Sequence, residues 1–255
     1  MASTKAVLVA ASVLVLAAQL ASGPSSVSGP TAVTEPSVHA TLAGDHGSTP
    51  AAGNVIAGVA ALKPDVHFSV GDLTYADGVP ESQWCDFVKQ RVGEGFPFEL
   101  VAGNHEDSST TNGTGGQINN ISACLPNQVP GAVGTYGREY YVDQPVASPL
   151  VRFIGISASL VFEDGSWTYA SGTPHLTWLA RAIDDARARS IPWIVVMNHI
   201  PCLTPSGTAC GINADLVALL MAKKVDLVVS GHDHFYARTH QLALSGACPV
   251  LVSGA

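Results

Sequence analysis

Charged side chains are scarce in this sequence of 255 residues: Asp, Glu, Lys and Arg together make up 13%, and only 12 residues are Lys or Arg. The formal net charge is -8, so no basic stripe can neutralise the phosphates of a nucleic acid or the headgroups of an anionic membrane. We therefore expect neither as a partner. An acidic chain must hold an anionic substrate by something other than bulk charge, and a metal site would do so.

A hydrophobic run long enough to cross a membrane is lacking as well. The apolar run from Ala6 to Ala18 is shorter than the roughly 20 residues that a span requires. Lys5 precedes this run and small residues around Ala21 to Gly23 follow it, which is the layout of a secretory signal peptide. We predict that residues 1–23 are a signal peptide, that the protein is secreted or extracytoplasmic, and that it has no stable membrane anchor.

The sequence shows no internal repeat and no second shift in composition. Residues 24–36, rich in Ser, Pro and Thr, are expected to form an arm without a core of its own, and residues 37–255 a single domain. The last residues, PVLVSGA, have the pattern of a strand that stops before its turn. The sequence therefore allows both a complete domain and one truncated at its C-terminus.

Five cysteines in an exported chain are typical of an oxidising compartment, where disulfides form. Cys202 and Cys210 are close enough in sequence to close one loop, and Cys85 with Cys124 would tie a helix to a long loop. Connectivity cannot be deduced from spacing alone, so this pairing is a hypothesis. It leaves Cys248 without a partner.

The domain alternates between apolar β-rich runs and helical patterns. The predicted strands are Val38–Ala43, Val66–Val70, Phe98–Ala102, Leu150–Ile156, Trp193–Met197 and Val225–Val229. Helices are predicted at Ala52–Leu62, after Thr173 with Pro174 at the first position, and after Asn213. This order predicts a layered α/β fold whose sheets are covered by helices. The stretch Asp107 to Gly137 has little periodicity, and we expect a loop that walls a site.

Five of the predicted strands end in residues that can bind a metal. The endings are Gly44-Asp45-His46-Gly47, Gly71-Asp72-Leu73-Thr74-Tyr75, Gly103-Asn104-His105-Glu106, Asn198-His199-Ile200-Pro201 and Gly231-His232-Asp233-His234. A lone Gly-Asp after a strand is usually a turn, and a lone His is usually an ordinary polar residue. Five such groups at the same place relative to their strands are expected to converge, because ligands of layered α/β folds bind at the carboxyl ends of strands.

The chemistry of these endings is specific. Asp, Asn and His combine oxygen and imidazole donors without a thiolate, which suits Fe, Mn or Zn rather than a closed structural zinc site. The candidate ligands are Asp45, Asp72, Tyr75, Asn104, His199, His232 and His234. They are too many for one ion and about right for two, and a shared carboxylate can hold two ions roughly 3.5–4 Å apart.

The order GD-x-G, GD-x-x-Y, GNHE, NH-x-P, GH-x-H resembles the calcineurin-like metallophosphoesterase superfamily and, within it, the purple acid phosphatases. The resemblance implies a four-layer sandwich of two mixed β-sheets flanked by α-helices. It implies a first metal held by Asp45, Tyr75 and His234, a second held by Asn104, His199 and His232, and Asp72 as the bridge. His105 would face the substrate as the catalytic residue. We expect no counterpart of the additional N-terminal β-domain of the large plant-type enzymes within these 255 residues.

Many members of the superfamily carry D-x-H in the first motif, whereas this sequence has Gly47 at the His position and His46 one residue earlier. The purple branch compensates with the Tyr of GD-x-x-Y, so Tyr75 would fill the coordination position that Gly47 leaves open. We expect His46 to lie beside the site or to be exposed rather than to be a ligand. For Tyr75 the alternative is a hydroxyl that hydrogen-bonds to Asp45 or Asp77.

The favoured function is a secreted phosphomonoesterase of the acid-phosphatase type, in which a metal-bound water attacks phosphorus. The expected cofactors are two metal ions, Fe(III) plus a divalent ion (Fe, Zn or Mn), and the expected partner is a small phosphoester. His105 would protonate the leaving alkoxide or orient the phosphate; the alternative is a structural His that supports Asn104. One rival function is a phosphodiesterase or nucleotide hydrolase with the same metals, and a second is an exported binding protein without turnover.

Overall fold

The computed structural model describes residues 15–16, 36–75, 80–108, 117–205, 210–239 and 250–253. The predictions of a signal peptide (1–23) and an arm (24–36) lie almost wholly outside these ranges; within them, Val15–Leu16 forms the short strand β1. No helix among the described residues is long and apolar enough to cross a membrane.

The first sheet has the order β1-β2-β3-β4. Strands β2 (Val38–Ala43), β3 (Val66–Val70) and β4 (Phe98–Val101) are parallel, and β1 pairs with β2 in the antiparallel direction. Two strands match their predicted bounds, and β4 ends one residue earlier. Because β2, β3 and β4 run in the same direction, their carboxyl ends meet at one edge of the sheet.

The second sheet is larger, with the order β12-β13-β11-β10-β7-β6-β5. Its members are β5 (Val133–Thr135), β6 (Glu139–Gln144), β7 (Val151–Ile156), β10 (Trp193–Asn198), β11 (Leu227–Ser230), β12 (Ala237–Arg238) and β13 (Val250–Ser253). Strands β7, β10, β11 and β13 are parallel, whereas β5, β6 and β12 pair in the antiparallel direction. Strand β13 confirms the terminal strand predicted from PVLVSGA. A separate hairpin joins β8 (Leu160–Phe162) to β9 (Gly165–Trp167).

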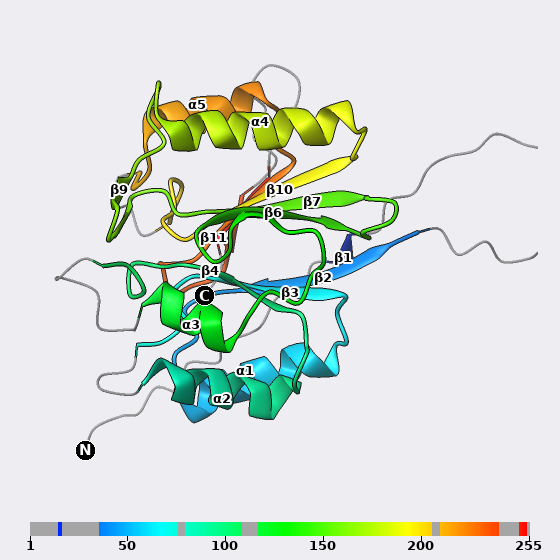
Figure 1. The fold of residues 1–255 in the computed structure, drawn as a ribbon, viewed down its shortest axis with the longest axis vertical. Helices are drawn as coiled ribbons and strands as arrows, with labels where there is room; N and C mark the ends of the chain where they lie inside the picture. Colours follow the sequence, from blue (N-terminus) through cyan, green and yellow to red (C-terminus); the bar gives the residue numbers. More distant parts are fainter. Residues whose placement is uncertain are drawn as a thin grey trace, which may run out of the picture.

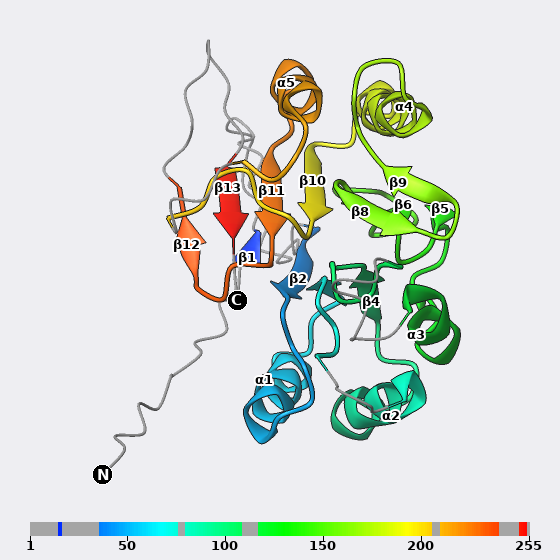
Figure 2. The same ribbon diagram turned by 90° about the vertical axis from the view of Figure 1, so that its left-hand side faces the viewer.

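Helices cover the outer faces of the two sheets (Figure 1). Helices α4 (Pro174–Ala188) and α5 (Ala214–Ala222) lie over the larger sheet, and α1 (Pro50–Ala61), α2 (Glu81–Val92) and α3 (Ile118–Cys124) lie against the smaller one. The view turned by 90° shows the same layers (Figure 2). The predicted four-layer sandwich of two mixed sheets is therefore confirmed.

Side-chain caps fix where the helices begin. The Thr173 hydroxyl accepts a hydrogen bond from the Leu176 amide before α4, and Asn213 accepts one from the Asp215 amide before α5, as their positions in the sequence predicted. Thr49 caps α1 in the same way, with Pro50 at its first position. Helix α1 therefore begins two residues before the predicted helix Ala52–Leu62, because Thr49 caps it and Pro50 occupies its first position.

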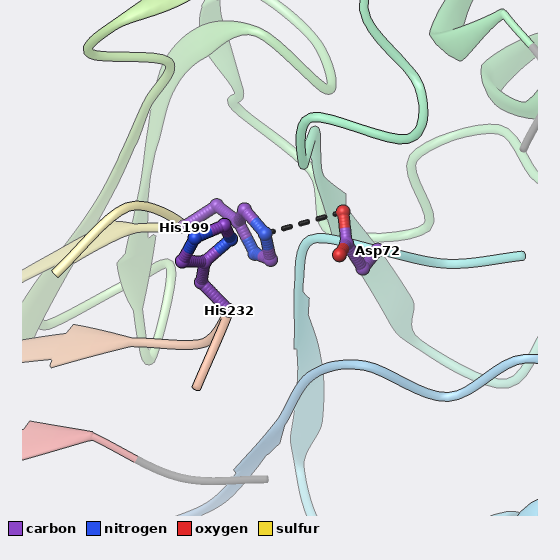
Figure 3. Close-up of side chains that lie close together, drawn as sticks. All are labelled: Asp72, His199 and His232. Carbon is purple, nitrogen blue, oxygen red and sulfur yellow. Dashed lines mark ion pairs between the residues drawn. The ribbon is translucent and has the colours of Figure 1, made fainter. Parts of the chain in front are cut away.

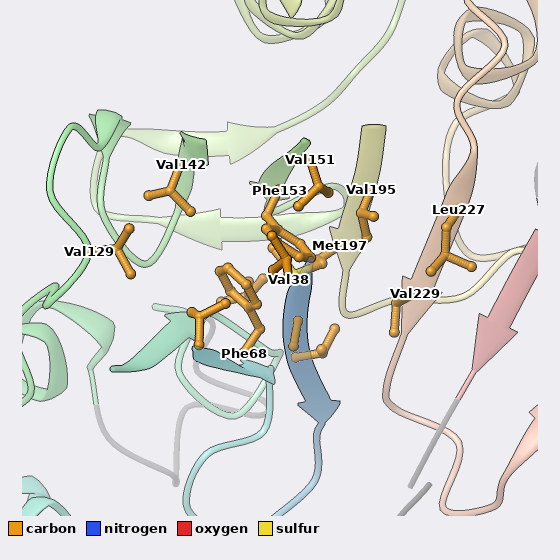
Figure 4. Packing of buried hydrophobic residues seen from close by; sticks show 14 of the residues in the cluster. Val38, Phe68, Val129, Val142, Val151, Phe153, Val195, Met197, Leu227 and Val229 are labelled. Atoms are coloured by element: carbon orange, nitrogen blue, oxygen red, sulfur yellow. The ribbon is translucent and has the colours of Figure 1, made fainter. Parts of the chain in front are cut away.

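The space between the two sheets is filled by apolar side chains (Figure 4). Phe68 of the smaller sheet packs against Phe153 of the larger one, with ring centroids 4.6 Å apart. Valine side chains and Met197 surround this pair. Burying a side chain of this size contributes about 1.5–3 kcal/mol, so the core holds the two sheets, and with them their carboxyl-end loops, in one fixed relation.

The long segment Asp107–Gly137 is less irregular than expected. It contains helix α3 and strand β5, and residues 109–116 lie outside the described ranges. Ile118 and Ile121 of α3 are buried in the same apolar cluster as Trp84 of α2. Tertiary packing thus stabilises a helix of seven residues, which is too short for its apolar periodicity to be recognised in the sequence.

Both hypothesised disulfides are present in the structure, Cys85–Cys124 and Cys202–Cys210. The first joins α2 to α3. The second closes the loop that follows β10. Cys248 lies outside the described residues.

Candidate metal centre

The structure brings all seven candidate ligands together at the carboxyl ends of β2, β3, β4, β10 and β11. They are Asp45, Asp72, Tyr75, Asn104, His199, His232 and His234, and each has a side-chain atom within hydrogen-bond distance of a side-chain atom of another. The convergence predicted from the strand endings is therefore observed.

Three of these side chains form a first group. The Tyr75 hydroxyl lies 3.0 Å from Oδ1 of Asp45 and 2.9 Å from Nε2 of His234. The same His234 nitrogen lies 3.5 Å from Oδ1 of Asp45. These are the three residues that the resemblance assigned to one metal.

A second group lies beside the first. Oδ1 of Asn104 is 3.1 Å from Nε2 of His199 and 2.9 Å from Nδ1 of His232. The two imidazole rings stand nearly perpendicular, with centroids 5.2 Å apart. Figure 3 shows His199 and His232 from one side of the site facing Asp72 from the other.

Asp72 lies between the two groups. Its Oδ2 accepts a hydrogen bond from the Tyr75 hydroxyl at 3.2 Å, and its Oδ1 lies 3.1 Å from Nε2 of His199. Each carboxylate oxygen therefore faces one group, which is the arrangement that a bridging ligand requires.

The backbone at three of the seven residues has a positive φ angle, 57° at Asp45, 47° at Asp72 and 75° at His232. Such conformations cost residues other than Gly on the order of 1–3 kcal/mol each. The turn at His232 directs its amide to the two carboxylate oxygens of Asp45, both at 3.0 Å. The strain is thus offset in part by hydrogen bonds that fix the first group.

Two glycines of the motifs are required by close approach. A Cβ atom at Gly71, where φ is +83°, would overlap the His199 ring, and a Cβ at Gly103 would overlap the amide and carboxylate of Asp72. The loops therefore pass each other at distances that only glycine permits.

The charges of the site are coupled. Burial of His199 disfavours its positive charge, but its hydrogen bond to Asp72 and the charge of that carboxylate outweigh burial and raise the pKa of His199 to about 9. Burial is the largest single influence on Asp72 and would raise its pKa, but the hydrogen bond to His199, the charge of that ring and the hydrogen bond from the His105 amide together outweigh burial and lower that pKa. Burial, followed by the charges of Asp45 and Asp72, raises the pKa of the Tyr75 phenol well above its ordinary value. A cation placed among these groups would lower the pKa of the Tyr75 phenol instead of raising it, and so would favour the phenolate.

His105 lies beside the seven residues and is partly exposed, with 27% of its side chain accessible. Its amide donates to Oδ1 of Asp72 at 3.1 Å, and its Nε2 is 3.8 Å from Oδ2 of the same residue. Its ring meets that of Tyr75 edge to face at 4.6 Å. It borders both a candidate bridging carboxylate and solvent, where a substrate would enter.

For His46 the sequence left two placements, beside the site or exposed to solvent, and the structure excludes the second. Only 8% of the residue is exposed, so the expectation of an exposed His46 is wrong. Its ring lies 5.9 Å from those of both His67 and Phe98, on the side of the sheet covered by helices. Burial lowers the pKa of His46 to about 4, because desolvation disfavours the imidazolium. No hydrogen bond among the described residues joins its side chain to the seven candidate ligands.

The sequence reading gave no role to Glu106, the last residue of GNHE. This residue is fully buried, and both of its carboxylate oxygens accept hydrogen bonds from the loops of the site. The signal that could have revealed it is the position of its carboxylate directly after His105, within the GNHE motif.

The donor set fits metal ions of the Fe, Zn and Mn kind. Asp72, His199 and His232 offer donor atoms that all lie within 4.8 Å of one another. Imidazole, carboxylate, amide and phenol groups are the donors that such ions accept.

Comparisons with known proteins agree with this geometry. The family model described as calcineurin-like phosphoesterase matches residues 38–236, a range that contains all five motifs. Purple acid phosphatase 18 of Arabidopsis thaliana is 26% identical over 209 residues, which cover 79% of this chain and 44% of that protein. A second protein of that plant, Fe(3+)-Zn(2+) purple acid phosphatase 12, is 25% identical over 185 residues, covering 68% and 37%.

A solved structure shares the fold. The purple acid phosphatase PPD1 from yellow lupin (Lupinus luteus) seeds superposes with a TM-score of 0.63 at 19% identity, covering 84% of this chain and 43% of that one. The chain thus spans less than half the length of these relatives. The match of the family model extends over well more than half of the chain and confirms the resemblance drawn from the motifs. The chain belongs to the calcineurin-like phosphoesterase family.

Proposed function

We propose that the protein is a dinuclear-metal phosphoester hydrolase that acts on phosphomonoesters. The observation that carries the proposal is the division of the site into two groups of nitrogen and oxygen donors with Asp72 between them. Membership of a phosphoesterase family, with relatives named purple acid phosphatase, supports the class of metal-dependent phosphoric ester hydrolase.

The residues assigned to the metals follow the two groups. Asp45, Tyr75 and His234 would hold one ion; Asn104, His199 and His232 would hold the other; Asp72 would contact both. Cations held there would supply Lewis-acid chemistry, polarising phosphoryl oxygens and lowering the pKa of a water toward about 7. Fe(III) in the group that contains Tyr75 and Zn, Fe or Mn in the other is the proposed pair, which agrees with the name of the Fe(3+)-Zn(2+) relative.

His105 is the proposed residue for proton donation to the leaving group or for a hydrogen bond to the phosphoryl group. The hydrogen bond from its amide to Asp72 holds the residue beside the site, and its partly exposed ring can reach a phosphoester bound over the two groups. An imidazolium there would donate a proton to the leaving alkoxide, and a neutral imidazole would donate a hydrogen bond to a phosphoryl oxygen. General acids of this kind contribute typically 10²–10⁴-fold.

We also propose that the protein is exported. Two disulfides support an oxidising compartment, and the first 23 residues have the composition of a signal peptide. Thiol titration of native protein is expected to find at most one free thiol among the five cysteines. Five reduced thiols would contradict the compartment and leave the chemistry untouched.

The function is tested by metal analysis together with activity. Purified protein is expected to hold two equivalents of transition metal, to hydrolyse small phosphomonoesters faster than phosphodiesters, and to lose activity on chelation and regain it on metal addition. Asp184→Ala provides a control, since Asp184 is an exposed carboxylate paired with Lys223 on the helical face. It should retain full metal content. Faster turnover of phosphodiesters would favour the rival phosphodiesterase, and two bound metals without any turnover would favour a binding protein.

A further inference from the structure

The loops that carry the candidate ligands are joined by one buried carboxylate. Oε1 of Glu106 accepts hydrogen bonds from the amides of Leu73 at 2.8 Å and Thr74 at 3.2 Å, in the loop after β3. Oε2 accepts one from the amide of Gly103 at 2.9 Å, in the loop after β4. The carboxylate therefore receives three backbone hydrogen bonds from two separate strand endings.

The three donor amides lie next to candidate ligands in the chain. Leu73 and Thr74 lie between Asp72 and Tyr75, and Gly103 directly precedes Asn104. The backbone amide of Glu106 also donates to the Gly103 carbonyl at 3.1 Å, and its carbonyl accepts from the Ile118 amide at 3.2 Å. Glu106 thus lies at the point where the two ligand loops and the start of α3 meet.

We propose that Glu106 is a positioning residue that sets the spacing between the two halves of the metal centre. The inference rests on the proposed function for the identity of the ligands, but the hydrogen bonds themselves are properties of the fold. Partners that orient ligands from behind typically contribute 10–100-fold to metal affinity or activity. Buried amides that lose their acceptor also carry a desolvation cost.

Glu106→Gln is the sharpest variant. It preserves shape, but an amide has a single acceptor oxygen and its NH₂ group would face an N–H donor, so the variant cannot accept from both loops at once. The matched control is Glu99→Gln. Glu99 is a fully buried carboxylate on β4 that accepts a hydrogen bond from the Gln128 amide at 2.9 Å. Within the described part of the chain, no hydrogen bond of its side chain reaches the ligand loops.

Two measurements on the full-length folded protein test the inference. Residue-resolved amide hydrogen exchange is expected to show protected amides at Leu73, Thr74 and Gly103 in the wild type and at least tenfold faster exchange at one or more of them in Glu106→Gln. Calorimetric titration with Zn²⁺ and with Mn²⁺ is expected to show an affinity reduced by 10-fold or more in Glu106→Gln and unchanged in Glu99→Gln.

The outcomes separate the inference from the proposed function. A wild type that binds neither metal would refute the proposed function, while the exchange measurement would still decide whether Glu106 joins the loops. Unchanged amide exchange in a folded Glu106→Gln would overturn the inference. If the wild type binds Zn²⁺ and Mn²⁺, an unchanged affinity of Glu106→Gln for both ions would overturn it as well. An equal loss of metal affinity in Glu99→Gln would also overturn the inference, because the loss would then not depend on hydrogen bonds to the ligand loops.

Discussion

The Tyr75 hydroxyl lies 2.9 Å from Nε2 of His234, although 159 residues separate the two in the sequence. The phenol comes from the loop after β3 and the imidazole from the loop after β11, so the contact joins the smaller sheet to the larger one. Asp45 completes the group at 3.0 Å from the same hydroxyl. The sequence left two interpretations of Tyr75, a metal ligand and a phenol hydrogen-bonded to Asp45 or to Asp77, of which Asp77 lies outside the described residues. A spectroscopic experiment decides between the two interpretations.

Protein produced with iron available is expected to be pink to violet, and Tyr75→Phe to be colourless while still folded. A phenolate is a hard anionic donor, and a trivalent cation overcomes the burial and the carboxylates that otherwise raise the phenol pKa. The measurement is the visible absorption spectrum. Tyr141→Phe is the control, since Tyr141 packs against Trp178 on the helical side and should leave the band unchanged. A wild type with two metals, oxidised iron and no visible band would show that Tyr75 is not a ligand.

Asp72→Ala is expected to abolish both metal binding and turnover, whereas Asn104→Ala should lose mainly one of the two ions. Asp72 contacts both groups through separate oxygens, and Asn104 contacts His199 and His232 of the second group. Removing the shared carboxylate takes one donor oxygen from each group. Metal content per protein and steady-state rates are the measurements. Full activity and two bound metals in Asp72→Ala would end the dinuclear model.

The effect of His105→Ala is expected to depend on the leaving group. With a poor alkyl leaving group, turnover should fall by about 10²–10⁴-fold, and with nitrophenol it should fall much less because protonation is no longer needed. Metal content should stay at the wild-type level, since His105 contacts Asp72 chiefly through its backbone amide. Equal losses on both substrates would assign His105 to substrate binding or to the structure of the site.

A pH dependence of stability is expected from Glu99. Burial raises its pKa to about 7 against the opposing hydrogen bond from Gln128, whereas the ordinary value is 4.5. The folded state therefore keeps this proton to higher pH than the unfolded state, and the free energy of unfolding should fall as pH rises from about 4.5 to about 7. The pKa difference corresponds to a change on the order of 3 kcal/mol.

Glu99→Gln should lack this component, because an amide does not titrate. Denaturant unfolding of both proteins across the window is the measurement, and the difference between their unfolding free energies should move in favour of Glu99→Gln as pH rises. Parallel profiles for the two proteins would contradict the raised pKa. Above about pH 7 the difference should become constant, since both states are then ionised.

Local features of the sequence determined much of this protein. Alternating strands and helices indicated a layered α/β fold, caps such as Thr173 and Asn213 located helix starts, and polar residues after five of the six predicted strands identified the seven candidate ligands. These signals are readable because they depend on neighbours in the chain. Helix α3 and the order of the strands in the larger sheet were not readable, since both are decided by packing between distant segments.

The family resemblance supplied the expected grouping of the ligands, and only the tertiary structure decided how they are placed and supported. Nothing in the spacing of the motifs shows that Tyr75 meets His234 or that Asp72 directs one oxygen to each group; those relations arise where loops from two sheets cross. The burial of His46 likewise depends on packing against Phe98. Glu106 is the clearest case, because its role lies in three hydrogen bonds to backbone amides. Every residue type except proline can supply a backbone N–H donor, so only the fold could reveal these contacts.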